Sequence, residues 1–331
     1  MSTAIQPLVV PRNGVMTRAR DYAELAKLRV TSLIVMTAWC GFYFGAQKSG
    51  VSSFSWGLFH TLVGIALVSA GTAALNEVME RETDGRMRRT AQRPLPAGRM
   101  SLLHAMIAGA AMSIAGALYL GWMLNSLTGW LSLATAAVYL AAYTPLKKVH
   151  PICTFIGAFP GAMPGVLGWT AARGRLEWGA LVMFAIVFFW QFPHFFSIAW
   201  LYREDYESGG VRMLPVVEQD GRSTARQILL YSIGLIPISL LPAFLGMAGK
   251  MYFVGALLMS LGLLYFGFRL ATFKMAPNTA RSKQRARQLL QATVIFTASS
   301  LHSTISTLFF LRTLIPCLIT MPLKMVSSSL R

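Results

Sequence analysis

Long apolar stretches alternate with short polar segments along almost the whole chain. Each apolar stretch has about 20 residues, which is the length that a helix needs to cross a bilayer core of roughly 30 Å. The pattern therefore predicts an all-α integral membrane protein, a bundle of about nine transmembrane helices. They are expected over residues 29–47, 56–76, 102–123, 127–145, 152–171, 178–201, 227–247, 251–271 and 289–311.

The predicted helices divide the chain into three parts. Residues 1–28 form a polar and basic tail that leads directly into the first span, with no cleavable signal peptide in evidence. Residues 29–311 form the transmembrane domain, and residues 312–331 form a C-terminal tail. An apolar patch at 314–323 is interrupted by Pro316 and Pro322, and it is too short for a tenth span.

The composition supports a membrane protein over a soluble one. Hydrophobic residues make up 55% of the chain and charged residues 13%, about half the charged share of a soluble domain. The net charge of +18 could suggest nucleic acid as a partner, but Lys and Arg retained in cytoplasmic loops explain it better in so apolar a chain. The three cysteines show neither CxxC pairs nor a metal-ligand spacing, so disulfide and zinc sites are not predicted.

The distribution of charge predicts the orientation in the membrane. With the N-terminus inside, the inner segments hold 23 Lys and Arg residues and the outer segments hold 7, which favours a cytoplasmic N-terminus. Of the 12 acidic residues only Glu177 falls outside, and nine lie in two inner windows, 77–84 and 204–220. None lies at the centre of a predicted span, where an ion pathway often has ionisable groups. We expect the chemistry at the cytoplasmic rim.

The first acidic window carries a ladder of oxygen donors. Asn76, Glu80 and Asp84 are four residues apart, so each step advances about 40° around a helix and the three project from one side. Such ligands suit Mg²⁺ and, through it, a diphosphate. Arginines follow at once between residues 86 and 99, and guanidinium groups bind phosphate oxygens. The alternative is a juxtamembrane loop whose charges pair with each other and with lipid headgroups.

The second acidic window, residues 202–215, also begins where a predicted span reaches the inner face. Glu204, Asp205 and Glu207 supply its carboxylates. Two acidic windows on one face are what a pair of cations bridging a diphosphate would need. Taken together, the windows favour a metal–diphosphate site over the pairing alternative.

Six short blocks along the chain form a recognisable set: Lys27-x-Arg29-Val30-Thr31, Asn76-x-x-x-Glu80-x-x-x-Asp84, Arg89-Thr90-x-x-Arg93-Pro94-Leu95, Trp190-Gln191-Phe192-Pro193-His194-Phe195, Tyr202-Arg203-x-Asp205-Tyr206 and Met213-Leu214-Pro215. These blocks resemble the motifs of the intramembrane (UbiA-type) prenyltransferase superfamily and, within it, those of the protoheme IX farnesyltransferases (heme O synthases). The likeness extends from about residue 21 to 295.

This resemblance implies a helical bundle with a cytoplasm-facing cavity, located in a bacterial inner membrane. It implies transfer of farnesyl from farnesyl diphosphate to a vinyl group of heme B, with Mg²⁺ as cofactor. The residues implied as catalytic are Asn76, Glu80, Asp84 and Asp205. The same four residues and Glu204 are implied as ligands of the metal. The residues implied for substrate binding are Arg89, Arg93, Lys147, His194, Tyr202 and Arg203. The implied partners are both substrates, the lipid bilayer and heme A synthase or terminal-oxidase assembly factors, and no nucleic acid.

Four positions depart from the family pattern. Glu80 stands where the superfamily usually has Asp, which keeps the charge and lengthens the reach. Tyr202 and Tyr206 occupy places where quinone-type relatives have two acids, and Leu28 stands where a Pro is common. The Ser- and Thr-rich end after about residue 296 fits the family poorly.

Several alternatives stay open at this level. One is a quinone- or chlorophyll-type prenyltransferase of the same superfamily, and another is a non-enzymatic transporter or heme chaperone with charged loops. His194 is either a helix-packing histidine bonded to a neighbour or a heme contact, since imidazole suits iron. Lys147 is either a diphosphate ligand or a positive-inside anchor.

Overall fold

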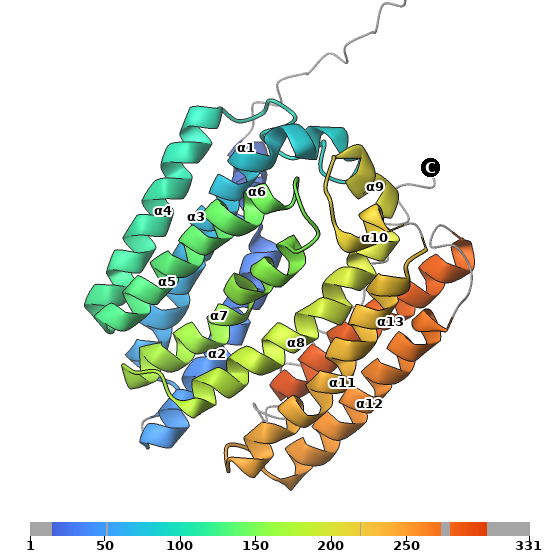
Figure 1. Ribbon diagram of the computed structural model, residues 1–331. Coiled ribbons are helices and arrows are strands. Elements are labelled where there is room, and N and C mark those ends of the chain that lie inside the picture. The colour runs from blue at the N-terminus through green and yellow to red at the C-terminus, as the bar shows by residue number, and fades with distance from the viewer. Residues whose placement is uncertain (1–14, 51, 219, 273–278, 303–331) are drawn as a thin grey trace, which may run out of the picture.

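The computed structural model describes residues 15–50, 52–218, 220–272 and 279–302, and within these ranges all regular secondary structure is helical (Figure 1). The elements are α1 (Val15–Leu25), α2 (Leu28–Ser49), α3 (Trp56–Arg86), α4 (Leu102–Met123), α5 (Ser126–Val138), the π-helical turn η1 (Tyr139–Tyr143), α6 (Thr144–Leu146), α7 (Cys153–Arg173), α8 (Trp178–Leu201), α9 (Arg203–Ser208), α10 (Leu214–Val217), α11 (Arg222–Phe244), α12 (Lys250–Ala271) and α13 (Ala280–His302).

The nine predicted apolar stretches correspond to long helices, so the helical membrane fold is confirmed. Seven of the helical segments are long and apolar enough to cross a bilayer, counting α5 to α6 as one segment. The other two are α7, which contains two prolines, and α13, whose first turns are strongly basic. The predicted count of nine spans is thus approximate. Part of the last predicted span, from residue 303, lies outside the described residues.

Small residues allow α2 and α7 to lie in close contact. A side chain added at Gly41 would meet the main chain of Gly165, and one added at Gly168 would meet Ala38. Helices that associate in a bilayer gain mainly from such close backbone approach, because lipid supplies no hydrophobic force between them. The glycines of α7 therefore allow it to pack closely beside α2 and α8 (Figure 1).

The two ends of the bundle differ in chemistry. At one end, four tryptophans at helix termini are between 70% and 88% exposed, namely Trp56, Trp122, Trp130 and Trp178. Exposed tryptophans at helix ends are typical of a membrane–water interface. The other end, here called the polar rim, is made of α1, the last turns of α3, the loop 87–101, α6, α9 and α10 (Figure 1).

Helix α3 extends about ten residues beyond its predicted apolar stretch. It has 31 residues and ends at Arg86, so both the apolar span and the first acidic window belong to one continuous helix. At its other end the Ser55 side chain accepts a hydrogen bond from Leu58 N–H and caps the first turn. A single rigid helix therefore carries the oxygen ladder from the bundle into the polar rim.

Candidate active site at the polar rim

The oxygen ladder is buried. Asn76 is 0% exposed, Glu80 8% and Asp84 1%. A carboxylate removed from water needs an opposite charge or several hydrogen bonds, since it otherwise costs several kcal/mol. The ladder must therefore be matched by partners from other elements.

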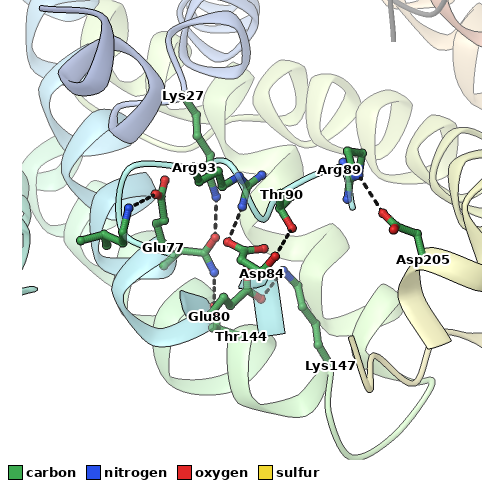
Figure 2. Close-up of polar contacts among 12 residues, drawn as sticks. Lys27, Glu77, Glu80, Asp84, Arg89, Thr90, Arg93, Thr144, Lys147 and Asp205 are labelled. Carbon is green, nitrogen blue, oxygen red and sulfur yellow. Dashed lines mark hydrogen bonds and ion pairs between the residues drawn. The ribbon is translucent and has the colours of Figure 1, made fainter. Parts of the chain in front are cut away.

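Each ladder residue has one cationic partner. Lys27 Nζ donates to Asn76 Oδ1 at 2.6 Å, Lys147 Nζ lies 2.8 Å from Glu80 Oε1, and Arg93 lies 2.6 Å from Asp84 Oδ2 (Figure 2). The partners come from three segments: the junction of α1 and α2, the residue after α6, and the loop 87–101. The charge pairing of the alternative interpretation is thus present, but between buried groups of distant segments.

The Asn76 amide is oriented from both sides. Its Oδ1 faces Lys27, while its Nδ2 donates to Thr144 Oγ1 at 3.1 Å, and that hydroxyl donates in turn to the Tyr139 carbonyl at 2.9 Å. Tyr139 begins η1, and π-helical turns occur preferentially at functional sites. The turn from η1 into α6 thus directs Thr144 to Asn76 and brings Lys147 to Glu80.

Lys27 combines partial burial with an unfavourable backbone conformation. At φ 45° and ψ 49° it is left-handed, and among the described residues it is the only non-glycine residue with positive φ. This conformation costs an L-residue about 1 kcal/mol or more, and such strain gathers at functional sites. Burial lowers the pKa of the Lys27 amine to about 8. Sequence reasoning did not assign Lys27 to the site, although it lies in a segment that carries the family resemblance.

The loop 87–101 covers the ladder. Thr90 Oγ1 donates to the Asp84 carbonyl at 2.9 Å, and Leu95 N–H donates to Glu77 Oε1 at 3.4 Å. Glu77 is 0% exposed, and its second oxygen has no hydrogen-bond partner within the described ranges. Glu77 was counted in the acidic window but not predicted as a site residue, and its position beside Asn76 was the available signal.

The second acidic window reaches the site through Asp205. Its Oδ2 lies 3.9 Å from Arg89 Nε (Figure 2). Its Oδ1 accepts a hydrogen bond from Arg88 N–H at 2.8 Å. The guanidinium carbon of Arg89 lies over the rings of Tyr202 and Tyr206, 5.4 Å and 5.5 Å from their centroids. The structure therefore brings the two windows together, by way of the loop 87–101.

Three other predicted residues lie outside this cluster. Glu204 is about half exposed and pairs with Lys283 of α13 at 2.9 Å. Arg203 is buried beside it in the first turn of α9. In α8, His194 is stacked on Trp190, and its Nδ1 lies 2.9 Å from Thr293 Oγ1, which is the inter-helix bond that the packing interpretation predicted.

The donor chemistry of the cluster fits a hard divalent cation. In the part of the chain that the structure describes, no three His, Cys, Asp or Glu side chains are grouped so as to hold a metal ion, and the ladder oxygens contact cationic side chains. All the candidate donors are nevertheless oxygens, which Mg²⁺ prefers. Glu77 Oε2 and Asp205 Oδ2 are buried without a hydrogen bond and thus have lone pairs to offer.

Comparison with known proteins gives concordant matches. The profile of the UbiA prenyltransferase family matches residues 34–290. The protoheme IX farnesyltransferase of Koribacter versatilis is 62% identical over 296 residues, covering 89% of this chain and 96% of that protein. The mitochondrial protoheme IX farnesyltransferase of Arabidopsis thaliana is 33% identical over 278 residues, covering 84% of this chain and 62% of that protein.

Solved structures share the fold at low sequence identity. A structure of digeranylgeranylglyceryl phosphate synthase superposes with a TM-score of 0.71 at 17% identity, covering 88% of this chain and 98% of that one. A UbiA homologue from Archaeoglobus fulgidus bound to GPP and Mg²⁺ gives a TM-score of 0.58 at 17% identity, covering 87% and 100%. These likenesses show that this chain has the same fold as those two proteins.

Proposed function

The chain belongs to the UbiA prenyltransferase family, and we propose that this membrane enzyme transfers the farnesyl group of farnesyl diphosphate to a vinyl group of heme B, giving heme O. The choice of acceptor is supported by the 62% identical relative, which is named a protoheme IX farnesyltransferase. The observation that carries the reaction class is the pairing of buried oxygen donors on α3 with cationic side chains from three other segments.

The proposed metal ligands are Asn76, Glu80 and Asp84 of α3 with Asp205 of α9. When bound, Mg²⁺ would neutralise the charge that develops on the departing diphosphate. The orphaned Asp205 Oδ2 supports a place for that side chain in the set. Glu204, the fifth predicted ligand, is outside our proposed set because its side chain pairs with Lys283 at the surface.

The proposed diphosphate ligands are Arg89, Arg93 and Lys147, joined by Lys27. Guanidinium and ammonium groups donate charge-assisted hydrogen bonds to phosphate oxygens, about twice as strong as neutral ones. Three of these four cations are already held in place by a ladder residue. Preorganised donors stabilise a leaving group without the cost of reorientation during the reaction.

The reaction needs no protein nucleophile. The bond between farnesyl C1 and the diphosphate oxygen breaks, and the diphosphate keeps the electron pair. The vinyl π electrons then attack the allylic cation, water adds to the resulting porphyrin-stabilised cation, and a proton is released. The apolar bundle below the polar rim excludes other water from the cation. We keep His194, Tyr202 and Arg203 as proposed substrate-binding residues. Tyr202 would act through Arg89, whose guanidinium lies over its ring, and His194 and Arg203 would lie nearer the heme acceptor.

The protein is a multi-pass membrane protein, and we place it in a bacterial cytoplasmic membrane with its N-terminus and polar rim on the cytoplasmic side. The support is the excess of 23 over 7 basic residues and the gathering of the acids at one end. Heme B and farnesyl diphosphate would enter from the cytoplasmic side or from the bilayer. Heme A synthase or terminal-oxidase assembly factors are proposed as partners that receive the product.

The direct test is turnover by the purified full-length protein in detergent. With heme B, farnesyl diphosphate and Mg²⁺, we expect a farnesylated heme by mass spectrometry, and chelation of Mg²⁺ should stop its formation. Turnover with an aromatic acceptor such as 4-hydroxybenzoate, and none with heme B, would refute the heme assignment in favour of a quinone-type enzyme. A transporter or heme chaperone would bind heme without product, and that binding would survive Asp84→Asn.

A further inference from the structure

Arg89 differs from the other cations of the candidate site in how it is held. Lys27, Arg93 and Lys147 each donate a hydrogen bond to a ladder residue. Arg89 donates none to any residue in the described ranges, and the nearest carboxylate oxygen is 3.9 Å away. The residue is exposed, with 28% of its side chain accessible, so solvent reaches the guanidinium. Its N–H groups are therefore not committed to any protein acceptor and can be offered to a ligand.

Two aromatic rings from one helical turn hold the guanidinium instead. Tyr202 and Tyr206 are four residues apart around the start of α9, so their rings lie on one side of that turn. The guanidinium carbon lies over both rings, 5.4 Å and 5.5 Å from their centroids. A cation over an aromatic face is attracted by the ring quadrupole, and this contact uses none of its N–H groups.

The main chains of the two segments are joined as well. Besides the bond from Arg88 N–H to Asp205, Ser208 Oγ donates to the Arg86 carbonyl at 3.3 Å. Gly209 touches Met87 so closely that an added Cβ would lie 2.8 Å from Met87 Cγ. Because these contacts fix the loop against α9, the two rings have a constant place relative to Arg89.

We infer that Tyr202 and Tyr206 are positioning residues that hold Arg89 so that its N–H groups remain available to the phosphate oxygens of the prenyl diphosphate. The identity of this ligand rests on the proposed function. The geometry assigns the tyrosines a role at the phosphate end of the substrate, away from the prenyl tail. Lys in place of Arg89 would keep the charge but would lose the planar fork that two rings can hold.

The test is a double-mutant cycle that measures binding instead of turnover. Inorganic diphosphate and farnesyl diphosphate are titrated into the full-length protein in detergent, without heme and with a chelator of divalent ions. The double variant Tyr202→Leu/Tyr206→Leu should bind both ligands about 5- to 30-fold more weakly, from two cation–π contacts. In the Arg89→Ala background the same ring removal should have no further effect. The variant Tyr202→Phe/Tyr206→Phe retains both rings and should restore most of the affinity.

A matched control is available on α12, where Arg269 lies over the Tyr265 ring at 5.7 Å. Tyr265→Leu removes a comparable contact far along the chain and should leave both affinities unchanged. Unchanged affinity in the leucine double variant would overturn the inference, as would an equal loss in the Arg89→Ala background. If the leucine variant fails to fold, the phenylalanine variant and Arg89→Lys still decide, because the inference requires Arg89→Lys to weaken binding.

Two further outcomes identify the ligand. If Tyr202→Leu/Tyr206→Leu alters the affinity for diphosphate only in nanodiscs that contain phosphatidylglycerol, Arg89 binds lipid headgroups and the inference is wrong. If heme B is never farnesylated while the binding cycle behaves as expected, the proposed acceptor fails and the role of the tyrosines stands. The loss should also be equal for inorganic diphosphate and farnesyl diphosphate, since a loss confined to farnesyl diphosphate would place the tyrosines at the prenyl tail.

Discussion

The two acidic windows look alike in sequence but are folded in opposite ways. In the first window the ladder of Asn76, Glu80 and Asp84 is buried within a 31-residue helix. In the second, α9 has only six residues and lies at the surface, so Glu204 is exposed, whereas the Asp205 carboxylate bonds to the loop 87–101. A rigid, covered helix makes every acid at four-residue spacing part of the site, whereas a short surface helix contributes one.

The energetics follow from the same difference. A buried carboxylate that loses its partner is left uncompensated, at a cost of about 3–5 kcal/mol. An exposed ion pair such as Glu204 with Lys283 contributes about 0–1 kcal/mol. We therefore expect substitutions of the buried residues in the first window to have large effects on turnover or stability. In the second window we expect a clear effect at Asp205 and little effect at its exposed neighbour Glu204. The following predictions test this, from the largest effect to the smallest.

Asp84→Asn is expected to reduce turnover most. The change removes a ladder charge and leaves Arg93 without its anionic partner, so both the proposed metal and the diphosphate cation are affected. We expect turnover with heme B and farnesyl diphosphate to fall by about 10³-fold. The control is Glu82→Gln, because Glu82 lies on the same helix but faces solvent beside Arg81. Equal losses in both variants would mean that burial does not distinguish the acids of this window.

Lys147→Met is expected to destabilise the fold. The substitution keeps the length of the side chain but leaves Glu80 buried without its cation, which costs about 3 kcal/mol. Thermal unfolding in detergent should show a lower Tm than wild type. Adding Glu80→Gln removes the stranded charge and should recover a large part of the loss. If the double variant is as unstable as Lys147→Met, the ion pair is not the source of the stability.

Asp205→Asn is expected to have an intermediate effect. The amide oxygen can still accept the Arg88 N–H, but the charge beside Arg89 and the proposed metal ligand are weakened. We expect turnover to fall by about 10- to 100-fold, the range for altered ligand support, with an increased requirement for Mg²⁺. A loss as large as that of Asp84→Asn would remove the distinction between the windows.

The strain at Lys27 predicts a smaller effect, visible when two variants are compared. Lys27→Ala and Lys27→Gly both remove the amine that bonds to Asn76, but only glycine is relaxed at φ 45°. The glycine variant should therefore be the more stable of the two by about 1 kcal/mol, measured as a higher Tm. Equal stability would show that the left-handed conformation is not retained once the amine is gone.

Glu204→Gln is expected to have the smallest effect. Its side chain is about half exposed and pairs only with Lys283, so turnover should stay within about twofold of wild type and the Tm should hardly change. A loss comparable to that of Asp205→Asn would place Glu204 among the metal ligands and would restore the full predicted set of the second window.

Much of the fold could be predicted because it depends on local composition. The apolar stretches correspond to the observed long helices, since a helix satisfies its backbone groups within its own segment in a bilayer. The helical spacing of Asn76, Glu80 and Asp84 was equally local, and α3 does continue through it. The predicted apolar span ended at residue 76, ten residues before α3 ends at Arg86, because a hydropathy pattern ends where the apolar residues end and not where the helix does.

The partners of the ladder could not be predicted in this way. Lys27 lies 49 residues from Asn76 along the chain, Lys147 lies 67 from Glu80, and Asp205 lies 117 from Arg88. Nothing local marks these pairs, because the chain enters and leaves the membrane between their members. The π-helical turn that directs Thr144 to Asn76 has no sequence signal either. The positive φ at Lys27 could not be predicted, because glycine, and not lysine, is the residue type typical of that conformation.

The sequence by itself thus determined where the long apolar helices lie and which oxygen-bearing residues share a side of α3, because hydropathy and helical periodicity are properties of neighbouring residues. Only the tertiary structure decided which cation meets which oxygen, that Asp205 and not Glu204 turns inward, and that two tyrosines hold Arg89. Those choices depend on helix packing and loop closure, which bring distant residues together.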